Sequence, residues 1–459
     1  MHYPWWYVPF VTSPMLIAAV ATIHIFVAMY AVGGGMFLAV ETQFAHRTQN
    51  RPYLGYLRDH AWFFILLTVV FGAITGVGIW WTIGLASPLA TEALIHIFVF
   101  GWAMEYVFFV IEIASAFLFF YFWDRLPAKT HTIFGYIYAV SAWISLVLIT
   151  SITAFMLNPG NWVQTPSFWV AFFNPEFIPQ TIARTGGALL LASLYVYLHA
   201  ALRREHDPEL RALIARRSTR PGLLGAVLIT GGGLWWFLAL PESAQAALAA
   251  ASALNILMLL IFAVTLVVFG MLYLGPYRNP GWITPGFAIL LFTFGLAAIG
   301  TGEFLREAIR KPYIIYGVVL SNQIYPEEIP GLRTSGYLEG GTWTHRYIAE
   351  HFPQAINARG EIDEGALLAL APEERVEVGE LLFLYHCNDC HSLEGYAAVS
   401  ESMRGWTPEM ILALVKEPHR ARFFMPPFAG SVEEAQLLTD YLVTIARPFP
   451  AGLVNGSSN

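Results

Sequence analysis

Long apolar stretches recur along the first two thirds of the chain, with short polar connections between them. They cover about residues 14–40, 62–84, 93–122, 133–157, 181–202, 222–240, 251–275 and 284–305. A helix needs about 20 mainly apolar residues to cross the ~30 Å of hydrocarbon in a bilayer, and each stretch is close to or above that length. The pattern therefore predicts eight membrane-spanning helices.

The composition indicates that these helices lie in a membrane, and the distribution of charge predicts their orientation. Hydrophobic residues make up 56% of the chain and charged residues only 12%. The connections after the odd-numbered helices hold twelve Lys and Arg, whereas those after helices two, four and six hold none. By the positive-inside rule the odd-numbered connections are cytoplasmic. We therefore expect a multi-pass protein of the cytoplasmic (inner) membrane, in contact with lipid and not nucleic acid, whose C-terminal segment lies on the periplasmic or extracellular side.

The chain becomes polar after the last apolar stretch. From residue 306 onward it has 20 acidic and 12 basic residues. Residues 312–371 are rich in Pro, Gly and Glu, a composition typical of irregular connections. The chain is therefore predicted to divide into a membrane domain over 1–310, a linker over 311–371 and a small domain over 372–459.

The only two cysteines lie in the pentapeptide Cys387-Asn388-Asp389-Cys390-His391. This spacing is typical of covalent haem attachment: two thiols three residues apart add to two vinyl groups of one porphyrin, and the adjacent histidine ligates the iron. A disulfide and a zinc half-site are the alternatives, but the chain offers no third cysteine. We therefore expect one haem c held by Cys387 and Cys390, with His391 as an iron ligand.

A second axial ligand is expected further along the chain. Met425, between Phe424 and Pro426, fits this role because a thioether raises the reduction potential, while Met403 and Met410 are competing candidates. Helical periodicity over 376–385 and over 433–445 predicts the helices that open and close the domain. The predicted fold is an all-α integral membrane protein, an eight-helix bundle followed by a small all-α class I cytochrome c domain.

Few ionisable residues enter the apolar stretches, and such residues are expensive in a bilayer and are functional candidates. His24 lies midway along the first stretch, and Glu105 and Glu112 lie seven residues apart, on one helix face. Arg184 begins the fifth stretch. The simpler interpretations are a histidine or glutamate hydrogen-bonded to a neighbouring helix, and ordinary surface charge for Glu303 and Glu307 at the end of the eighth stretch.

In its order of motifs, the membrane part resembles subunit I of the cytochrome bd oxygen reductases. The resemblance spans about residues 15–320. The motifs that carry it are Thr22-Ile23-His24-Ile25-Phe26, Glu41-Thr42, Gly72-Ala73-Ile74-Thr75-Gly76, the stretch from Glu105 through Glu112 to Trp123-Asp124-Arg125-Leu126, and Glu307-Ala308-Ile309-Arg310-Lys311-Pro312-Tyr313.

The resemblance implies a set of cofactors and roles. His24 and Glu307 would each ligate one haem of an oxygen-reducing pair, and Arg310 would bind a haem propionate. Glu112 would deliver protons, as would Glu105, which matches the family only with a one-residue slip. The cofactors implied are two haems b, with haem d as the alternative to one of them. The partner implied is a second multi-span subunit or a second copy of this chain.

Three departures from the family bear on electron entry. The connection between helices six and seven, about residues 241–250, is too short for the family's quinol-oxidising loop. The family's helix-five histidine, a ligand of its low-spin haem b, has no counterpart at 182–185, which puts the ligand role of Met258 in doubt as well. The family's ninth helix is replaced by the C-terminal domain.

These features favour an enzyme, a bd-like terminal oxidase subunit. It would pass electrons from a c-type cytochrome or another respiratory donor through its own haem c to a membrane haem pair that reduces oxygen to water. The alternative is a non-catalytic electron-transfer cytochrome of a larger respiratory complex. A third hypothesis is reduction of another small molecule, such as nitric oxide, at the same haem pair.

Overall fold

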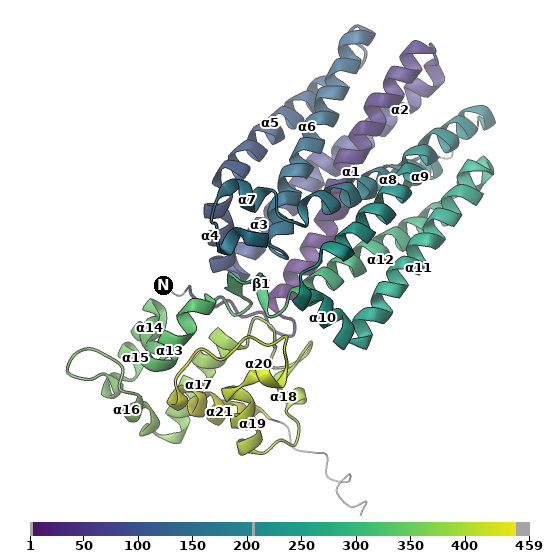
Figure 1. The fold of residues 1–459 in the computed structure, drawn as a ribbon. Coiled ribbons are helices and arrows are strands. Elements are labelled where there is room, and N and C mark those ends of the chain that lie inside the picture. Colours follow the sequence, from purple (N-terminus) through teal and green to yellow (C-terminus); the bar gives the residue numbers. More distant parts are fainter. Residues whose placement is uncertain (1–2, 204–206, 447–459) are drawn as a thin grey trace, which may run out of the picture. The chain divides into compact units, whose positions relative to one another are not determined.

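The computed structural model describes residues 3–203 and 207–446, and within them eight helices are long and apolar enough to span a membrane (Figure 1). The protein is therefore a multi-pass membrane protein, as predicted. The spans are α1 (Ser13–Arg47), α2 (Arg51–Ile65) continued by η1 (Leu66–Phe71) and α3 (Gly72–Ala86), α5 (Val99–Tyr121), α6 (Ala128–Phe155), α8 (Phe177–Arg203), α9 (Pro208–Ala239), α11 (Ser252–Leu272) continued by η3 (Tyr273–Tyr277), and α12 (Pro285–Arg310).

Short helices occupy several connections between the spans. They are α4 (Pro88–Ile97), η2 (Gly160–Val163), α7 (Phe168–Phe172), α10 (Glu242–Ala250) and η4 (Pro280–Trp282). Helix α10 fills almost all of the connection between α9 and α11, so this connection is as short as the sequence predicts. The second span begins earlier than predicted, at Arg51, because apolar and aromatic residues alternate with charged ones through its first three turns.

Small residues let α8 and α9 pack closely. A Cβ atom added at Gly186 of α8 would lie 2.7 Å from the carbonyl oxygen of Gly225, and one added at Gly232 of α9 would lie 2.6 Å from the amide nitrogen of Ala183. Close backbone approach at small residues is a common way to join helices in a bilayer, where the hydrophobic effect does not drive them together.

The chain forms two compact units. The bundle unit comprises Val20–Ile79 and Leu94–Arg310, and the C-terminal unit comprises Met1–Ala19, Trp80–Ala93 and Lys311–Asn459. The C-terminal end of the predicted 372–459 domain, residues 447–459, lies outside the described residues.

The segment predicted as an irregular linker is largely folded. It contains the two-stranded antiparallel pair β1 (Tyr313–Ile315) and β2 (Val319–Leu320), the 3-10 turns η5 (Pro326–Glu328) and η6 (Pro353–Ala355), and the helices α13 (Ile329–Ser335), α14 (Tyr337–Gly340), α15 (Thr342–His351) and α16 (Glu364–Leu368). Its apolar residues, such as Leu338 and Ile348, share one core with Leu382 and Leu437 from the following residues. The high Pro and Gly content reflects short helices with tight turns, not an absence of structure.

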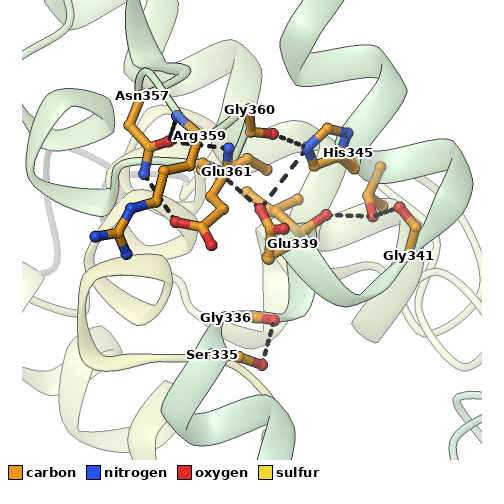
Figure 2. Close-up of polar contacts among 12 residues, drawn as sticks. Ser335, Gly336, Glu339, Gly341, His345, Asn357, Arg359, Gly360 and Glu361 are labelled. Atoms are coloured by element: carbon orange, nitrogen blue, oxygen red, sulfur yellow. Dashed lines mark hydrogen bonds and ion pairs between the residues drawn. The ribbon is translucent and has the colours of Figure 1, made fainter.

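Polar side chains stabilise the turns of this segment (Figure 2). Asn357 Oδ1 accepts hydrogen bonds from the amides of Arg359 and Glu361 at 2.8 and 3.1 Å. His345 Nε2 lies 2.9 Å from the carbonyl oxygen of Gly360, and Glu339 accepts from the amide of Ile362 at 2.7 Å. These hydrogen bonds pair backbone N–H and C=O groups of the turns that have no partner in regular secondary structure.

Two helices cross at the centre of the C-terminal unit. They are α17 (Pro372–His386) and α21 (Val432–Ile445), which contain the two helices predicted there, and the shorter α18 (Val399–Ser402), α19 (Pro408–Lys416) and α20 (Pro418–Ala421) lie between them in sequence. A Cβ atom added at Gly379 of α17 would lie 2.7 Å from Cβ of Tyr441 of α21. Glycine is required here because the two helices touch at this point.

Candidate functional site

The Cys387–His391 pentapeptide, which the sequence predicts to attach haem, follows the C-terminal end of α17. The amide of Cys387 donates to Phe383 O at 2.8 Å as the helix ends, and the amides of Cys390 and His391 both donate to Cys387 O, at 3.1 and 2.9 Å. This tight turn brings the two thiols and the imidazole together. Both cysteines are free and partly buried. Burial raises the pKa of the Cys387 thiol to about 12.

The ring of His391 has the orientation that an iron ligand needs. Its Nδ1 lies 3.0 Å from the carbonyl oxygen of Ala397, so Nδ1 carries the proton and donates it, and Nε2 keeps its lone pair. Metal-ligating histidines are commonly fixed in this way by a hydrogen bond on the other ring nitrogen. Burial also lowers the pKa of His391, which favours the neutral form. The residues present therefore fit a covalently attached haem.

The three candidate methionines differ in their surroundings. Met403 is buried in the core of the C-terminal unit, whereas Met410 is 49% exposed. Met425 is partly buried in a loop fixed by its amide, which donates to Arg422 O at 2.9 Å, and by its carbonyl oxygen, 2.9 Å from His419 Nδ1. Met425 stays the predicted second ligand.

The N-terminal segment packs against this turn within the C-terminal unit. Asn388 Nδ2 donates to Trp6 O at 3.1 Å, and the amide of Tyr396 donates to Phe10 O at 2.9 Å. Gly395 has φ of +104°, and a Cβ atom there would lie 2.9 Å from Phe10 Cα, so the close approach requires glycine. A residue between Cys387 and Cys390 and one that follows them are therefore hydrogen-bonded to backbone carbonyl groups of the N-terminal segment.

A charged pair borders the same turn. Lys311 Nζ lies 3.8 Å from Cys390 Sγ. Burial raises the pKa of Asp389 to about 7, and the nearby Lys311 ammonium offsets part of that rise.

In the bundle unit, His24 contacts the Gly72–Gly76 motif at the start of α3. His24 Nδ1 lies 3.1 Å from Thr75 Oγ1, and a Cβ atom added at Gly76 would lie 3.1 Å from His24 Cε1. This is the inter-helix hydrogen bond that the simpler interpretation of His24 predicts. The ring also has a backbone hydrogen bond with Gly72, and it packs so closely on Gly76 that a side chain there would crowd it.

The two glutamates of α5 both contact α6, as their seven-residue spacing predicts. Glu105 Oε1 accepts from Ser145 Oγ at 2.8 Å, and Glu112 Oε1 accepts from Tyr138 Oη at 3.1 Å. Tyr138 Oη also lies 3.0 Å from Ala31 O, so it connects α5 with α1. Each carboxyl group has one such hydroxyl partner, and within 3–203 and 207–446 neither forms an ion pair with a positively charged side chain.

A cluster of guanidinium and carboxylate groups lies at the end of α12. Arg306 Nε donates to Glu303 at 2.9 Å, and Arg310 pairs with Glu307 and donates to Met156 Sδ at 3.6 Å. Arg310 is only 5% exposed. The buried atoms Arg310 Nε and Arg306 Nη1 have no hydrogen-bond partner within the described residues. Buried, unused N–H donors of this kind fit an anionic group such as a porphyrin carboxylate.

The region of the missing helix-five histidine is occupied by protein contacts. Arg184 Nη1 donates to Thr150 Oγ1 at 3.4 Å and interacts electrostatically with Glu303 and Arg306. Met258 packs in an apolar cluster with Leu157 and Leu240. Among the described residues, no three His, Cys, Asp or Glu side chains converge on one metal position.

Sequence reasoning missed a second polar cluster in the bundle unit. We define the inner cluster as Tyr30, Glu41, Tyr53, Tyr56, His60, Tyr195, His199 and Arg217. Glu41 pairs with Arg217, whose Nη2 donates to Oε1 at 3.0 Å, and accepts from Tyr53 Oη at 2.8 Å. His60 was placed outside the predicted second span, which began at residue 62. The available signal was Tyr53, Tyr56 and His60 at helical spacings of three and four residues.

Comparisons with known proteins found matches to the membrane part of the chain. Residues 13–236 match the family model described as cytochrome bd terminal oxidase subunit I. Among solved structures, the bd oxidase from Geobacillus thermodenitrificans is similar with a TM-score of 0.56 and 18% sequence identity, over 66% of this chain and 88% of that chain. No curated protein matches. Through residues 13–236 this multi-pass membrane chain thus matches the cytochrome bd terminal oxidase subunit I family, and its helical fold is that of a bd oxidase chain.

Proposed function

We propose that this protein is a bd-like terminal oxidase subunit that receives electrons from a c-type donor through its own haem c and reduces oxygen to water at a haem pair in the bundle unit. The observation that carries the proposal is the presence, in one chain, of a bd-type bundle and of a Cys387–His391 turn that offers His391 Nε2. The haems, when bound, supply one-electron redox chemistry and an open iron position for oxygen.

The C-terminal unit serves electron entry. Cys387 and Cys390 would hold the haem c covalently, and His391 and Met425 would ligate its iron. The domain over 372–459 would be a cytochrome c domain with α17 and α21 as its crossing helices. The nine-residue helix α10 supports this assignment, because it fills the connection in which bd oxidases carry their quinol loop and leaves no length for one.

In the bundle unit, His24 and Glu307 are the proposed ligands of the two haems b, one of which is replaced by haem d in the alternative composition. Thr75 orients the His24 ring through Nδ1. Arg310, whose buried Nε–H has no hydrogen-bond partner within the described residues, binds a haem propionate. The guanidinium balances the negative charge of the propionate, which is costly to bury without a partner.

Glu112 and Glu105 are the proposed proton-transfer groups. A carboxyl group that transfers protons must bind and release a proton readily, so strong partners must not hold it in one protonation state. Each of the two has one hydroxyl partner on α6, and Tyr138 and Ser145 can each donate to the ionised form and stay in place when it is protonated.

The proposed setting is the cytoplasmic membrane, with the C-terminal unit on the periplasmic or extracellular side. The orientation rests on the twelve Lys and Arg in the odd-numbered connections. Proposed partners are a c-type cytochrome or another respiratory donor, and a second multi-span subunit or a second copy of this chain.

The test is oxygen uptake by the purified holoprotein with a reduced c-type cytochrome as donor. Wild type should sustain uptake, His391→Ala should lose donor-driven uptake, and His24→Ala should lose uptake while its haem c is still reduced by the donor. Gly331→Ala is a suitable control, because a Cβ atom at Gly331 meets no other atom within 4 Å. Unchanged uptake in His24→Ala would contradict the proposal.

The second candidate is a non-catalytic electron-transfer cytochrome of a larger respiratory complex. The observation that favours it is Arg184, which forms protein contacts where the family has a haem ligand. In that case every haem is six-coordinate and the reduced protein does not bind carbon monoxide. A carbon monoxide difference spectrum of the reduced protein, with haems b and c quantified on the same sample, separates the two functions.

A further inference from the structure

The inner cluster lies where α1, α2, α8 and α9 meet, near the end of the bundle unit that carries the basic connections. We call this end the basic end. α1 ends at Arg47 and α2 begins at Arg51, while α8 ends at Arg203 and α9 begins at Pro208. The proposed functions above leave the cluster's histidines and tyrosines unused.

Two imidazoles form the centre of the cluster. The rings of His60 on α2 and His199 on α8 have centroids 5.0 Å apart. His60 is fully buried, and Tyr30 Oη lies 3.1 Å from its Nε2. His60 Nδ1 and His199 Nδ1 are both buried and have no hydrogen-bond partner within the described residues. Since buried polar atoms are bonded to protein or to ordered water, these two nitrogens indicate a position for internal water.

The cluster reaches the surface through His199. This histidine interacts electrostatically with Arg203 and Asp59, which form an ion pair whose side chains are 35% and 51% exposed. Tyr56 lies between this ion pair and the imidazoles: Arg203 lies over its ring at 5.8 Å, and its ring centroid is 5.9 Å from that of His60. An exposed carboxylate therefore lies next to a partly buried imidazole, which in turn contacts a fully buried one.

At its inner end the cluster approaches a group that already has a proposed proton role. Tyr30 stacks on Tyr195 at 4.0 Å and lies within electrostatic range of Tyr138. Tyr138 donates its hydroxyl hydrogen to Glu112 at 3.1 Å. The groups therefore form a sequence from the surface inward: Asp59, His199, His60, Tyr30, Tyr138 and Glu112.

We infer that this sequence is a proton-uptake relay that brings protons from the basic end to Glu112, with internal water bridging the His199–His60 and Tyr30–Tyr138 steps. The inference rests on the proposed role of Glu112. In each step a group gains one proton and loses another: His60 takes a proton at Nδ1 and releases one from Nε2 to Tyr30 Oη, and Tyr30 passes its own hydroxyl proton onward. One proton is moved, and His60 ends protonated at Nδ1, so it returns to the tautomer protonated at Nε2 before the next transfer.

The other charged groups of the inner cluster hold the relay in place and do not carry it. Glu41 pairs with Arg217, and Tyr53 donates to Glu41 at 2.8 Å. Glu41 is only 5% exposed, so water does not screen its pairing with the Arg217 guanidinium, and this carboxylate is costly to protonate. The Asp59–Arg203 pair at the entrance of the relay is partly exposed, so water screens it and Asp59 can exchange protons. These residues join α1, α2 and α9 beside the imidazoles.

The test measures proton uptake when the haems are reduced, without oxygen. The holoprotein in nanodiscs is mixed anaerobically with hexaammineruthenium(II), a one-electron reductant that releases no protons, in weak buffer with a pH dye. Haem reduction and proton uptake are followed together by stopped flow. We expect His60→Phe, His199→Phe and Tyr30→Phe to slow proton uptake by about tenfold or more while the rate of haem c reduction is unchanged.

Two variants separate a relay from a structural role. His60→Gln keeps a polar partner for Tyr30 but cannot pass a proton, so it should be as slow as His60→Phe even where it is more stable. Tyr197→Phe, a buried tyrosine of α8 bonded to Thr219 and outside the sequence of groups, is the control and should take up protons at the wild-type rate.

Equal uptake rates in wild type and the three relay variants would overturn the relay, and so would a wild type that takes up no protons on reduction. Because the experiment needs no oxygen, its outcome is independent of oxidase activity. If the protein consumes no oxygen but its proton uptake depends on His60, the relay is supported and the proposed oxidase function is contradicted.

Discussion

Two buried carboxyl groups, one in each unit, are held in different ways. In the C-terminal unit, Glu434 is 1% exposed and accepts hydrogen bonds from the backbone amides of Tyr337, Leu338 and Ser431 at 2.8, 2.7 and 2.9 Å. In the bundle unit, Glu112 is held by one side-chain hydroxyl, that of Tyr138. A carboxyl group with three backbone donors is fixed in place, whereas one with a single hydroxyl can change its protonation and its position.

The difference indicates different roles. Glu434 joins α14 to the start of α21, and its bonds satisfy amides that would otherwise be buried without partners. Among the described residues, Glu112 accepts from the Tyr138 hydroxyl and from no backbone amide, so little stability offsets the cost of a carboxyl group in an apolar helix. Glu112 is therefore the better functional candidate of the two.

The largest expected effect is that of Glu112→Gln. If Glu112 transfers protons, oxygen uptake should fall by about 10²- to 10⁴-fold, the usual contribution of a proton-transfer group. Haem content and thermal stability should be unchanged, because glutamine can still accept from Tyr138. Oxygen consumption with a saturating reduced donor measures the effect. Uptake within a factor of two of wild type would assign Glu112 a structural role like that of Glu434.

Glu434→Gln should give the opposite pattern, with stability lost and activity per folded molecule kept. An amide offers one acceptor oxygen in place of two, so the free energy of unfolding should fall by about 1–3 kcal/mol. Thermal unfolding followed by helical circular dichroism is the measurement, with Glu433→Gln, the same change at a partly buried neighbour on α21, as control.

The same pair of variants has a pH dependence whose sign follows from burial. Burial raises the pKa of Glu434 from 4.5 to about 7, partly offset by its three amide donors. The folded protein therefore holds this proton more tightly than the unfolded chain, so the resulting stabilisation is present below about pH 4.5 and is lost as the pH rises through 7. The stability gap between wild type and Glu434→Gln should narrow from pH 5 to pH 8. A gap that widens would show that the ionised form is the one the amides favour.

A smaller effect is expected for Tyr138→Phe, which removes the hydroxyl partner that Glu112 has among the described residues and the last relay member before it. Loss of this step should slow proton delivery to Glu112, so oxygen uptake should fall by about tenfold. Tyr136 lies on α6, as Tyr138 does, and donates a hydrogen bond to Gln43 of α1. Tyr136→Phe therefore serves as the matched comparison. An equal loss in both variants would point to helix packing as the cause.

The smallest effect is expected for Ser145→Ala at Glu105. Its hydroxyl donates to Glu105 at 2.8 Å, and Glu105 is the less secure of the two family matches. We expect a loss of less than about threefold in oxygen uptake. A loss larger than that of Tyr138→Phe would reverse the order of importance assigned to the two glutamates.

The sequence was sufficient for features that depend on local periodicity. The eight spans, the helices over 376–385 and 433–445, and the shared face of Glu105 and Glu112 all follow from residue spacing, and the structure contains each of them. The motif from Gly72 to Gly76 was identified by resemblance only, and the contact of Thr75 with His24 gives it a physical reason.

Features that join distant segments could not be predicted in this way. Glu434 bonds to amides 96 and 97 residues earlier in the chain, and the imidazoles of His60 and His199 come from different helices. Spacing within one helix carries no information on such pairs. The helices of 311–371 were missed because each is short, and short helices are stabilised by tertiary packing that composition does not reveal.

The contact between Asn388 and Trp6 joins residues separated by 382 positions. Trp6 is synthesised before the eight spans of the described residues, and Asn388 is made only after all of them. The turn that carries Cys387 and Cys390 therefore gains this support only after the membrane-spanning part has been synthesised.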